Sequence, residues 1–297
     1  MSSRSLALYD AFSDVAFGGS QAAVIVDAAG VNASTRQRVA REIGMPATAF
    51  VDAYGADWIE AQFISTVQQL PMCGHGTLCL LTHMVESGLM QPQLDIQLRL
   101  PATTACVSVT TTASRRLQVM LDIAAPIFEP APPHQEELLA LLGLDATALA
   151  PGLPLETARG DFIHLVVPLV GLDAMRAIRP DFSAMVAFCH AHGIETIAVF
   201  CRDTEDAARD LHVRDFCPAV GVSESAAAGT TNAALTSYLL RHALVTRIPE
   251  VSVNAEQGLE LGRPSSIHSR VALQDDRITR LQVGGIATRM FQGEIFL

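Results

Sequence analysis

The pattern of apolar and polar positions predicts a mixed α/β protein with two similar halves. Two mainly apolar runs, 78–85 and 233–240, each follow a small-residue turn that contains glycine, which predicts a helix at each. Segments with alternating or β-branched residues predict strands, and many links between them are too short for a crossover, which favours antiparallel pairing. The expected strands include 6–12, 22–26, 105–110, 117–123, 162–167, 196–200, 266–273, 278–283 and 287–291.

A Pro-rich segment, 126–133, is the expected boundary between two domains. The prediction is an N-terminal domain over 1–125 and a C-terminal domain over 126–283, with the final strand 284–297 free to return to the first. Ser34 is the expected N-cap of a helix that runs to about Ile43.

Composition narrows the functional class. The chain has 297 residues, of which 49% are hydrophobic and 17% charged, which is typical of a well-packed soluble protein. A net charge of -11 argues against a nucleic-acid partner, and no apolar run is long enough for a membrane span. The chain shows no signal pattern at its start, and its six cysteines form neither a zinc motif nor a disulfide framework, so we expect a cytoplasmic protein. His190 and His192 are expected on the surface rather than as metal ligands.

The turn 71–77 places a thiol, Cys73, two residues before an imidazole, His75, at an expected helix start. Backbone N–H groups are unpaired there and the helix dipole is positive, so the turn suits a carboxylate. The positive end of the helix dipole is also expected to lower the pKa of Cys73. A thiol beside an anion-binding turn suits proton transfer at a carbon next to a carboxylate. A buried cysteine is, however, more often a packing residue.

A second turn, 222–232, has a similar layout. Aligning Gly74 with Gly229 sets Cys73 opposite Ala228 and His75 opposite Thr230. A repeat of this kind predicts two similar domains with one binding site between them.

The chain resembles the phenazine-biosynthesis (PhzF-like) family, whose fold is similar to that of diaminopimelate epimerase. The resemblance spans nearly the whole chain. The matching stretches are 9–12, 17–24, 41–42, 48–51, 73–77, 214–216, 221–224, 257–258, 262–265 and 283–285.

This resemblance implies two pseudo-symmetric domains, each a curled, mostly antiparallel sheet or barrel around a central helix. It implies a ligand in the cleft between the N-termini of the two central helices, no cofactor, and a homodimer. It also identifies departures. Ala47 stands where the family has its catalytic glutamate, Ser225 replaces an aspartate, and Ala226 replaces the following proline. Thr230 keeps the hydroxyl of the usual serine.

The leading hypothesis is a cofactor-independent isomerase that shifts a double bond or epimerises a small carboxylic acid, cyclic or not. Ala228 stands where a two-cysteine racemase needs its second thiol, so a proton shift on one face is favoured. The expected catalytic residues are Cys73, His75 and Thr230. The expected substrate-binding residues are Gly18, Gly19, Ser20, Gly74, Gly76, Ser225, Gly229 and Thr231.

Two alternatives stay open. One is a dehydratase or lyase that acts on a hydroxylated amino acid. The other is a catalytically retired protein that binds a small acid, in which case Cys73 is an inert thiol; a low pKa of Cys73 favours an enzyme. Glu224 is expected to be a helix cap or a surface charge, and Asp10 to be structural.

Overall fold

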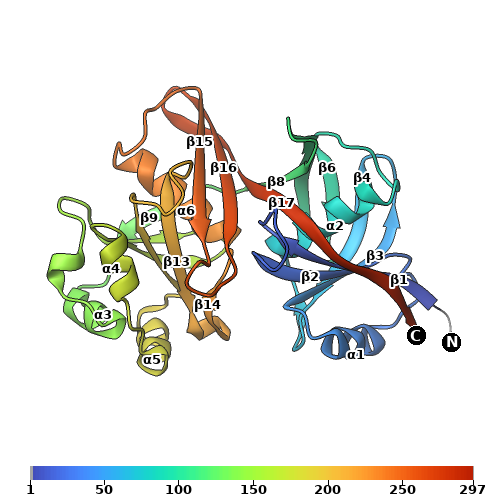
Figure 1. The fold of residues 1–297 in the computed structure, drawn as a ribbon, viewed down its shortest axis with the longest axis horizontal. Helices are drawn as coiled ribbons and strands as arrows, with labels where there is room; N and C mark the ends of the chain where they lie inside the picture. Colours follow the sequence, from blue (N-terminus) through green and yellow to red (C-terminus); the bar gives the residue numbers. More distant parts are fainter. Residues whose placement is uncertain (1–2, 297) are drawn as a thin grey trace. The chain divides into compact units, whose positions relative to one another are not determined.

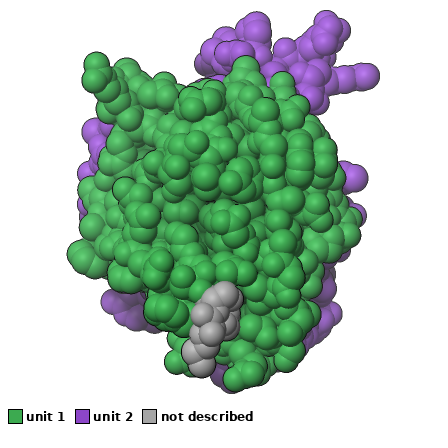
Figure 2. Space-filling view, turned by 90° about the vertical axis from the view of Figure 1, so that its right-hand side faces the viewer, with its two compact units in different colours: residues 1–122, 262–266, 284–297 green, residues 123–261, 267–283 purple. Residues whose placement is uncertain are grey.

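The computed structural model describes residues 3–296 of the chain. The chain divides into two compact units, coloured separately in Figure 2. Unit 1 comprises residues 1–122, 262–266 and 284–297, and unit 2 comprises residues 123–261 and 267–283. No helix within the described residues is both long and apolar enough to cross a bilayer.

Unit 1 is built on a closed ring of strands (Figure 1). Around the ring, β1 pairs with β2, then β3, β4, β6, β7 and β8 follow, and β17 pairs with both β8 and β1. The short β5 extends β4. The strands are β1 (Ser3–Ala11), β2 (Ser20–Ile25), β3 (Ala47–Tyr54), β4 (Trp58–Ile64), β5 (Gln69–Leu70), β6 (Ile96–Arg99), β7 (Thr104–Thr111), β8 (Leu117–Ile123) and β17 (Arg277–Phe296).

The helix α2 (Gly74–Glu86) is the core of unit 1. Nine consecutive residues, from Gly76 to Met84, are buried, so the helix is covered on all sides. In contrast, α1 (Ala33–Ile43) buries only one side, against a small cluster that includes Ile25 and Phe50. The expected cap of α1 at Ser34 is wrong: the N-cap is Asn32, whose side chain accepts the Thr35 N–H at 2.9 Å, because asparagine caps as well as serine does.

The strands of unit 2 belong to the same 17-stranded hydrogen-bonded sheet; here β9 to β13 pair in chain order, and β13 also pairs with β14 and β15. Its strands are β9 (Ile127–Pro130), β10 (Glu156–Arg159), β11 (Ile163–Pro168), β12 (Thr196–Cys201), β13 (Leu211–Cys217), β14 (Val222–Ser225), β15 (Glu250–Gln257) and β16 (Ser265–Gln274), with the first part of β17. Its helices are α3 (Gln135–Leu142), α4 (Leu172–Ala177), α5 (Phe182–His192) and α6 (Gly229–Arg241), with two 3-10 turns, η1 (Ala146–Ala148) and η2 (Pro218–Val220).

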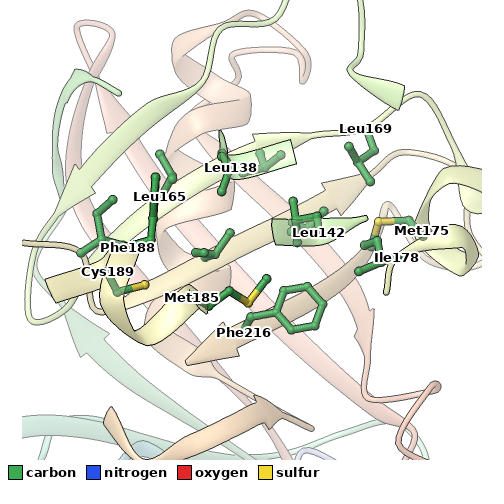
Figure 3. Close-up of a cluster of buried hydrophobic side chains, with 14 of the residues drawn as sticks. Leu138, Leu142, Leu165, Leu169, Met175, Ile178, Met185, Phe188, Cys189 and Phe216 are labelled. Carbon is green, nitrogen blue, oxygen red and sulfur yellow. The ribbon is translucent and has the colours of Figure 1, made fainter. Parts of the chain in front are cut away.

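The core of unit 2 has two layers. The helix α6 is buried over ten consecutive residues, from Thr231 to Leu240, and is therefore the counterpart of α2. A separate cluster joins α3, α4 and α5 to the opposite side of the sheet, with Leu138, Met185 and Phe216 among its members (Figure 3). This apolar layer holds α3 and α5 against one another.

The expected internal repeat is present in the topology. In unit 1, β2 and β3 run parallel around α1, β3 and β4 run antiparallel, and β6 returns parallel to β4 after α2. In unit 2, β11 and β12 run parallel around α4 and α5, β12 and β13 run antiparallel, and β15 returns parallel to β13 after α6. The predicted fold class is therefore confirmed.

The tail differs from the expectation. The separate strands expected at 278–283 and 287–291 are one continuous strand, β17. The glycine pair lies inside this strand. At Gly284 the chain approaches β8 so closely that a Cβ atom would lie 1.8 Å from the carbonyl oxygen of Val119. Glycine is needed there for close approach rather than for a turn.

Candidate functional site

The turn before α2 is fixed by β4 and β5. Phe63 of β4 pairs with Leu70 of β5, and its ring then covers the first turn of α2. A Cβ atom at Gly76 would lie 2.9 Å from the Phe63 ring and 3.0 Å from the Cys73 sulfur. Gly76 is therefore required by packing, whereas a Cβ atom at Gly74 would meet no neighbour within 4 Å.

Cys73 caps α2. Its sulfur accepts the Gly76 N–H at 3.4 Å, and its carbonyl oxygen accepts the Thr77 hydroxyl at 2.8 Å. The sulfur also lies 3.5 Å from Nε2 and 3.6 Å from Nδ1 of His75. The structure thus brings together the thiol and the imidazole that the sequence singled out.

The expected low pKa of Cys73 is wrong. Burial raises the pKa of the Cys73 thiol to about 12, and the Gly76 N–H opposes this only in part. One weak N–H···S contact cannot replace the water that a thiolate loses.

His75 also stays uncharged. Although part of its surface reaches solvent, burial of the ring lowers the pKa of His75 to about 4. At neutral pH the turn therefore holds a protonated thiol beside a neutral imidazole. A neutral imidazole can accept a proton, so the turn can supply a general base without forming a thiolate.

The turn before α6 has the same backbone shape but lacks a cap. Ala228 is the N-cap, in an extended conformation close to that of Cys73, and offers no side-chain hydrogen bond. The half-buried Gly229 and Thr230 follow. Behind them, the Asn232 amide donates to the Ala228 carbonyl oxygen at 2.9 Å and to the Gln257 side chain at 2.9 Å. The first turn of α6 is thus held from behind and uncapped by any side chain at its N-terminus.

Ser225 and Thr231 lie close to this turn, and their hydroxyl groups are engaged with the protein. The Ser225 hydroxyl donates to the Ala227 carbonyl oxygen at 3.2 Å. Thr231 is fully buried, and its hydroxyl oxygen lies 3.5 Å from Nδ1 of His164. A ligand would therefore bind the backbone N–H groups of these residues more readily than their hydroxyl groups.

Asp215 is a buried carboxyl group that the sequence reasoning passed over. It lies on β13 directly opposite Ser225, and the hydroxyls of Thr231 and Thr196 donate to it. Burial is the largest influence and raises the pKa of Asp215 to about 7, although these hydroxyls oppose the rise. Its Oδ1 atom is buried and has no hydrogen-bond partner within residues 3–296.

His164 completes this buried polar cluster. Its Nδ1 atom lies 2.6 Å from the Thr196 hydroxyl oxygen, and burial lowers the pKa of His164 to about 4. A hydrogen-bonded chain therefore runs from His164 through Thr196 to Asp215 and on to Thr231, directly behind the first turn of α6. The signals in the sequence were a histidine in the otherwise apolar β11 and an aspartate next to an arginine in β13.

Glu224 does not have the expected role of a helix cap or surface charge. Its side chain is 5% exposed, and both carboxylate oxygens accept from Arg214 at 2.8 Å. The β13–β14 hairpin causes this, because Glu224 pairs with Phe216 and so shares a face with Arg214. Arg214 also donates to the Met175 carbonyl oxygen at 3.1 Å, which anchors α4.

Gly18, Gly19 and Ser20 lie in unit 1, where β1 turns into β2. Both glycines are buried, and a Cβ atom at Gly19, whose φ is +53°, would lie 1.9 Å from the Ala11 carbonyl oxygen. Arg263 donates to the carbonyl oxygens of Gly18 and Gly19 at 2.6 and 2.8 Å and pairs with Asp10 at 2.8 Å. The structural role expected of Asp10 is thus found.

Ala47, at the position of the family glutamate, opens β3 and is fully buried. It pairs with Ala22 of β2, so no acidic group replaces the glutamate from the opposing strand position. Two surface hollows of unit 2 are lined by residues between 131 and 177 and include neither turn.

Comparisons with known proteins agree with this architecture. The family model of the phenazine biosynthesis-like proteins matches residues 9–293. A trans-2,3-dihydro-3-hydroxyanthranilate isomerase from Pseudomonas fluorescens is 28% identical, with 98% of each chain covered. An uncharacterized isomerase, YddE, from Escherichia coli O157:H7 is 25% identical, with 96% of each chain covered.

Among solved structures, a PhzF-family phenazine biosynthesis protein from Bacillus anthracis matches with a TM-score of 0.91, at 22% identity and with all of both chains covered. The predicted fold is confirmed by this likeness. The prediction of an enzyme of the isomerase class is confirmed by the curated relatives.

Proposed function

The chain belongs to the phenazine biosynthesis-like protein family, and from that premise we propose that it is a cofactor-independent isomerase of a small carboxylic acid. The reaction is a double-bond shift or an epimerisation, and the acid is cyclic or open-chain. The observation that carries the proposal is the contact between Cys73 and His75 at the N-terminus of α2, with sulfur to nitrogen distances of 3.5 and 3.6 Å.

His75 is the proposed proton carrier. It takes a proton from the carbon next to the carboxylate. The electron pair of that C–H bond forms a double bond to the adjacent carbon, and the π pair of the original double bond moves to the far carbon. The same proton then returns at the far end of the allylic system, so no oxidant or reductant is needed. Because burial holds the pKa of His75 at about 4, the imidazolium is a strong acid and gives the proton back readily. A single group suffices for the double-bond shift when both transfers occur on one face, whereas an epimerisation needs a second proton donor on the opposite face.

Cys73 is proposed to orient the imidazole by accepting a weak hydrogen bond from the N–H group of His75, which leaves the other ring nitrogen as the base. With a pKa of about 12, the thiol stays protonated at neutral pH and is not itself a base. It also holds the first turn of α2 through the Gly76 N–H.

In unit 2, the N-terminus of α6 is proposed to bind a carboxylate group. The N–H groups of Gly229, Thr230 and Thr231 fall in the first turn, where no intrahelical acceptor is available and the dipole is positive. Ala228 provides no side-chain cap to compete with a ligand. Thr230 adds a half-buried hydroxyl group, while Gly74 and Gly76 present backbone at the other turn.

The test is proton exchange in D₂O. The protein is incubated with a panel of unsaturated cyclic acids, amino acids and hydroxy acids, and mass spectrometry measures deuterium gain or loss of water. We expect His75→Gln to lower the turnover rate by about 100-fold or more, and Thr230→Val to raise KM with less effect on kcat. Ser223→Ala, an exposed position on β14, is the control. Exchange that is unchanged in His75→Gln would refute the assignment of the proton carrier.

One observation favours a second candidate, a retired enzyme that binds a small acid. The pKa of Cys73 is raised, and Ala47 and Ser225 stand at the family's acidic positions. Few side chains are therefore left to act as an acid or a base. Calorimetric binding of an acid from the panel without any exchange, lost in Thr230→Val, would establish this function instead. Loss of water with formation of a keto acid would point to the dehydratase alternative.

The family resemblance supports a homodimer, and six cysteines without a disulfide or zinc pattern support a cytoplasmic location. Light scattering coupled to size-exclusion chromatography tests the dimer, and fractionation of the producing cell tests the location. A monomer at micromolar concentration would overturn the first of these expectations.

A further inference from the structure

Away from both turns, the helical layer of unit 2 brings together two imidazoles and a carboxylate. His134 precedes α3, Glu137 lies in its first turn, and His192 is the last residue of α5. One ligand atom from each side chain can be chosen so that all three lie within 4.8 Å of one another. From this cluster, and in contrast to the expectation from the sequence for His192, we propose that His134, Glu137 and His192 form a binding site for a divalent late transition metal such as Zn²⁺.

The donor set decides the class of ion. Two imidazole nitrogens and one carboxylate oxygen suit Zn²⁺, Ni²⁺, Co²⁺ or Cu²⁺, whereas Mg²⁺ and Ca²⁺ require mainly oxygen ligands. Three protein ligands leave one tetrahedral position for water. Ligand atoms around a tetrahedral Zn²⁺ lie roughly 3.4 Å apart. The distances between the three ligand atoms, which are at most 4.8 Å, therefore need to shorten by about 1.4 Å at most.

The neighbourhood orients the ligands. Nδ1 of His134 lies 3.5 Å from the Glu137 carboxylate, and the His134 and His192 rings are 4.6 Å apart between centroids. The Phe188 ring packs on His192 at 4.6 Å, which limits its rotation. His134 makes no side-chain capping bond to α3, so its imidazole is free of the competing role that its N-cap position allows.

The backbone beneath the cluster is fixed. The Leu138 N–H donates to the His134 carbonyl oxygen at 2.9 Å, and Leu138 and Phe188 both belong to the buried cluster that joins α3 and α5 (Figure 3). A metal ion at this site would therefore connect the start of α3 to the end of α5, and it would add stability to a layer that is already packed.

The experiment uses the full-length protein, stripped with EDTA and titrated with ZnCl₂ by calorimetry. We expect one equivalent to bind, and we expect His134→Ala and His192→Ala each to weaken this binding by at least 10-fold. His190→Ala is the matched control, because His190 is an exposed histidine on the same last turn of α5. Co²⁺ provides an independent readout, since a tetrahedral site gives an intense visible absorption band that should vanish in His192→Ala.

Circular dichroism confirms that each variant is folded, and Glu137→Gln keeps the size of the side chain while removing its charge. Binding of wild-type strength in both His134→Ala and His192→Ala would overturn the proposal. Equal weakening in all variants, including His190→Ala, would also overturn it, because it would indicate diffuse chelation by surface histidines.

Discussion

Replacing Asp215 with asparagine is expected to change how the stability of unit 2 depends on pH. The Asp215 carboxyl is fully enclosed between β13 and α6, and its pKa rises from an ordinary value of 3.8 to about 7. The unfolded chain therefore releases this proton near pH 4, whereas the folded protein keeps it until about pH 7. Between these values the folded state binds more protons than the unfolded state, so stability falls as the pH rises.

The size of the effect follows from the shift. A shift of about three pKa units corresponds to a loss of about 4 kcal/mol in the stability of the wild type. This loss is absent at pH 4, grows up to pH 7 and is constant above it. Asparagine does not titrate, so Asp215→Asn should gain about 4 kcal/mol relative to the wild type between pH 4 and pH 8. The new amide needs partners for its N–H groups and can cost about 1–3 kcal/mol, but this cost does not depend on pH.

Urea unfolding at pH 4.5, 6 and 8, followed by circular dichroism, measures the difference. The single tryptophan, Trp58, lies in unit 1, so its fluorescence reports on that unit while circular dichroism reports on the whole chain. Asp173→Asn, a fully exposed carboxylate on α4, is the control. The reasoning is refuted if the stability difference between Asp215→Asn and the wild type varies by less than about 1 kcal/mol across this range.

Three further predictions concern the two turns. Because the pKa of Cys73 is about 12, native protein should not react with iodoacetamide at Cys73 at pH 8, and peptide mapping that shows rapid labelling would contradict this. Gly76→Ala should destabilise unit 1 by about 1–3 kcal/mol through overpacking, whereas Gly74→Ala should be neutral or stabilising; equal melting temperatures would argue against the packing account. Glu224→Ala should cost about 3–5 kcal/mol because it leaves buried Arg214 unpaired, and a loss below about 1 kcal/mol in urea unfolding would show that the pair is dispensable.

The elements of the fold could be predicted because they depend on local pattern. An apolar run after a glycine turn indicates a buried helix wherever it occurs, and both α2 and α6 were found in this way. The continuity of β17 could not be predicted, because a Gly-Gly pair predicts a break and its close approach to β8 depends on a partner distant in the sequence.

The chemistry of the site was harder to predict, since protonation depends on burial. Cys73 was correctly placed at a helix N-terminus, but the direction of its pKa shift depends on how completely α2 is enclosed. For Asp215 and Arg214 on β13, too, the sequence alone does not reveal which partners surround each side chain. They are adjacent in sequence and point to opposite faces, so Arg214 meets Glu224 while Asp215 meets α6. Which face lies inside is decided by the whole sheet.

The comparison between the two turns supports the proposed division of roles. Cys73 and Ala228 occupy equivalent N-cap positions with similar backbone angles, so the folds alone would give both helices the same affinity for an anion. At α2 the Cys73 sulfur already accepts an N–H group, which reduces what the turn can offer a carboxylate. At α6 the cap is an alanine, and a buried hydrogen-bonded cluster holds the turn from behind. Within its own unit, the turn before α2 therefore carries the acid–base side chain, and the turn before α6 is the one more open to an anion.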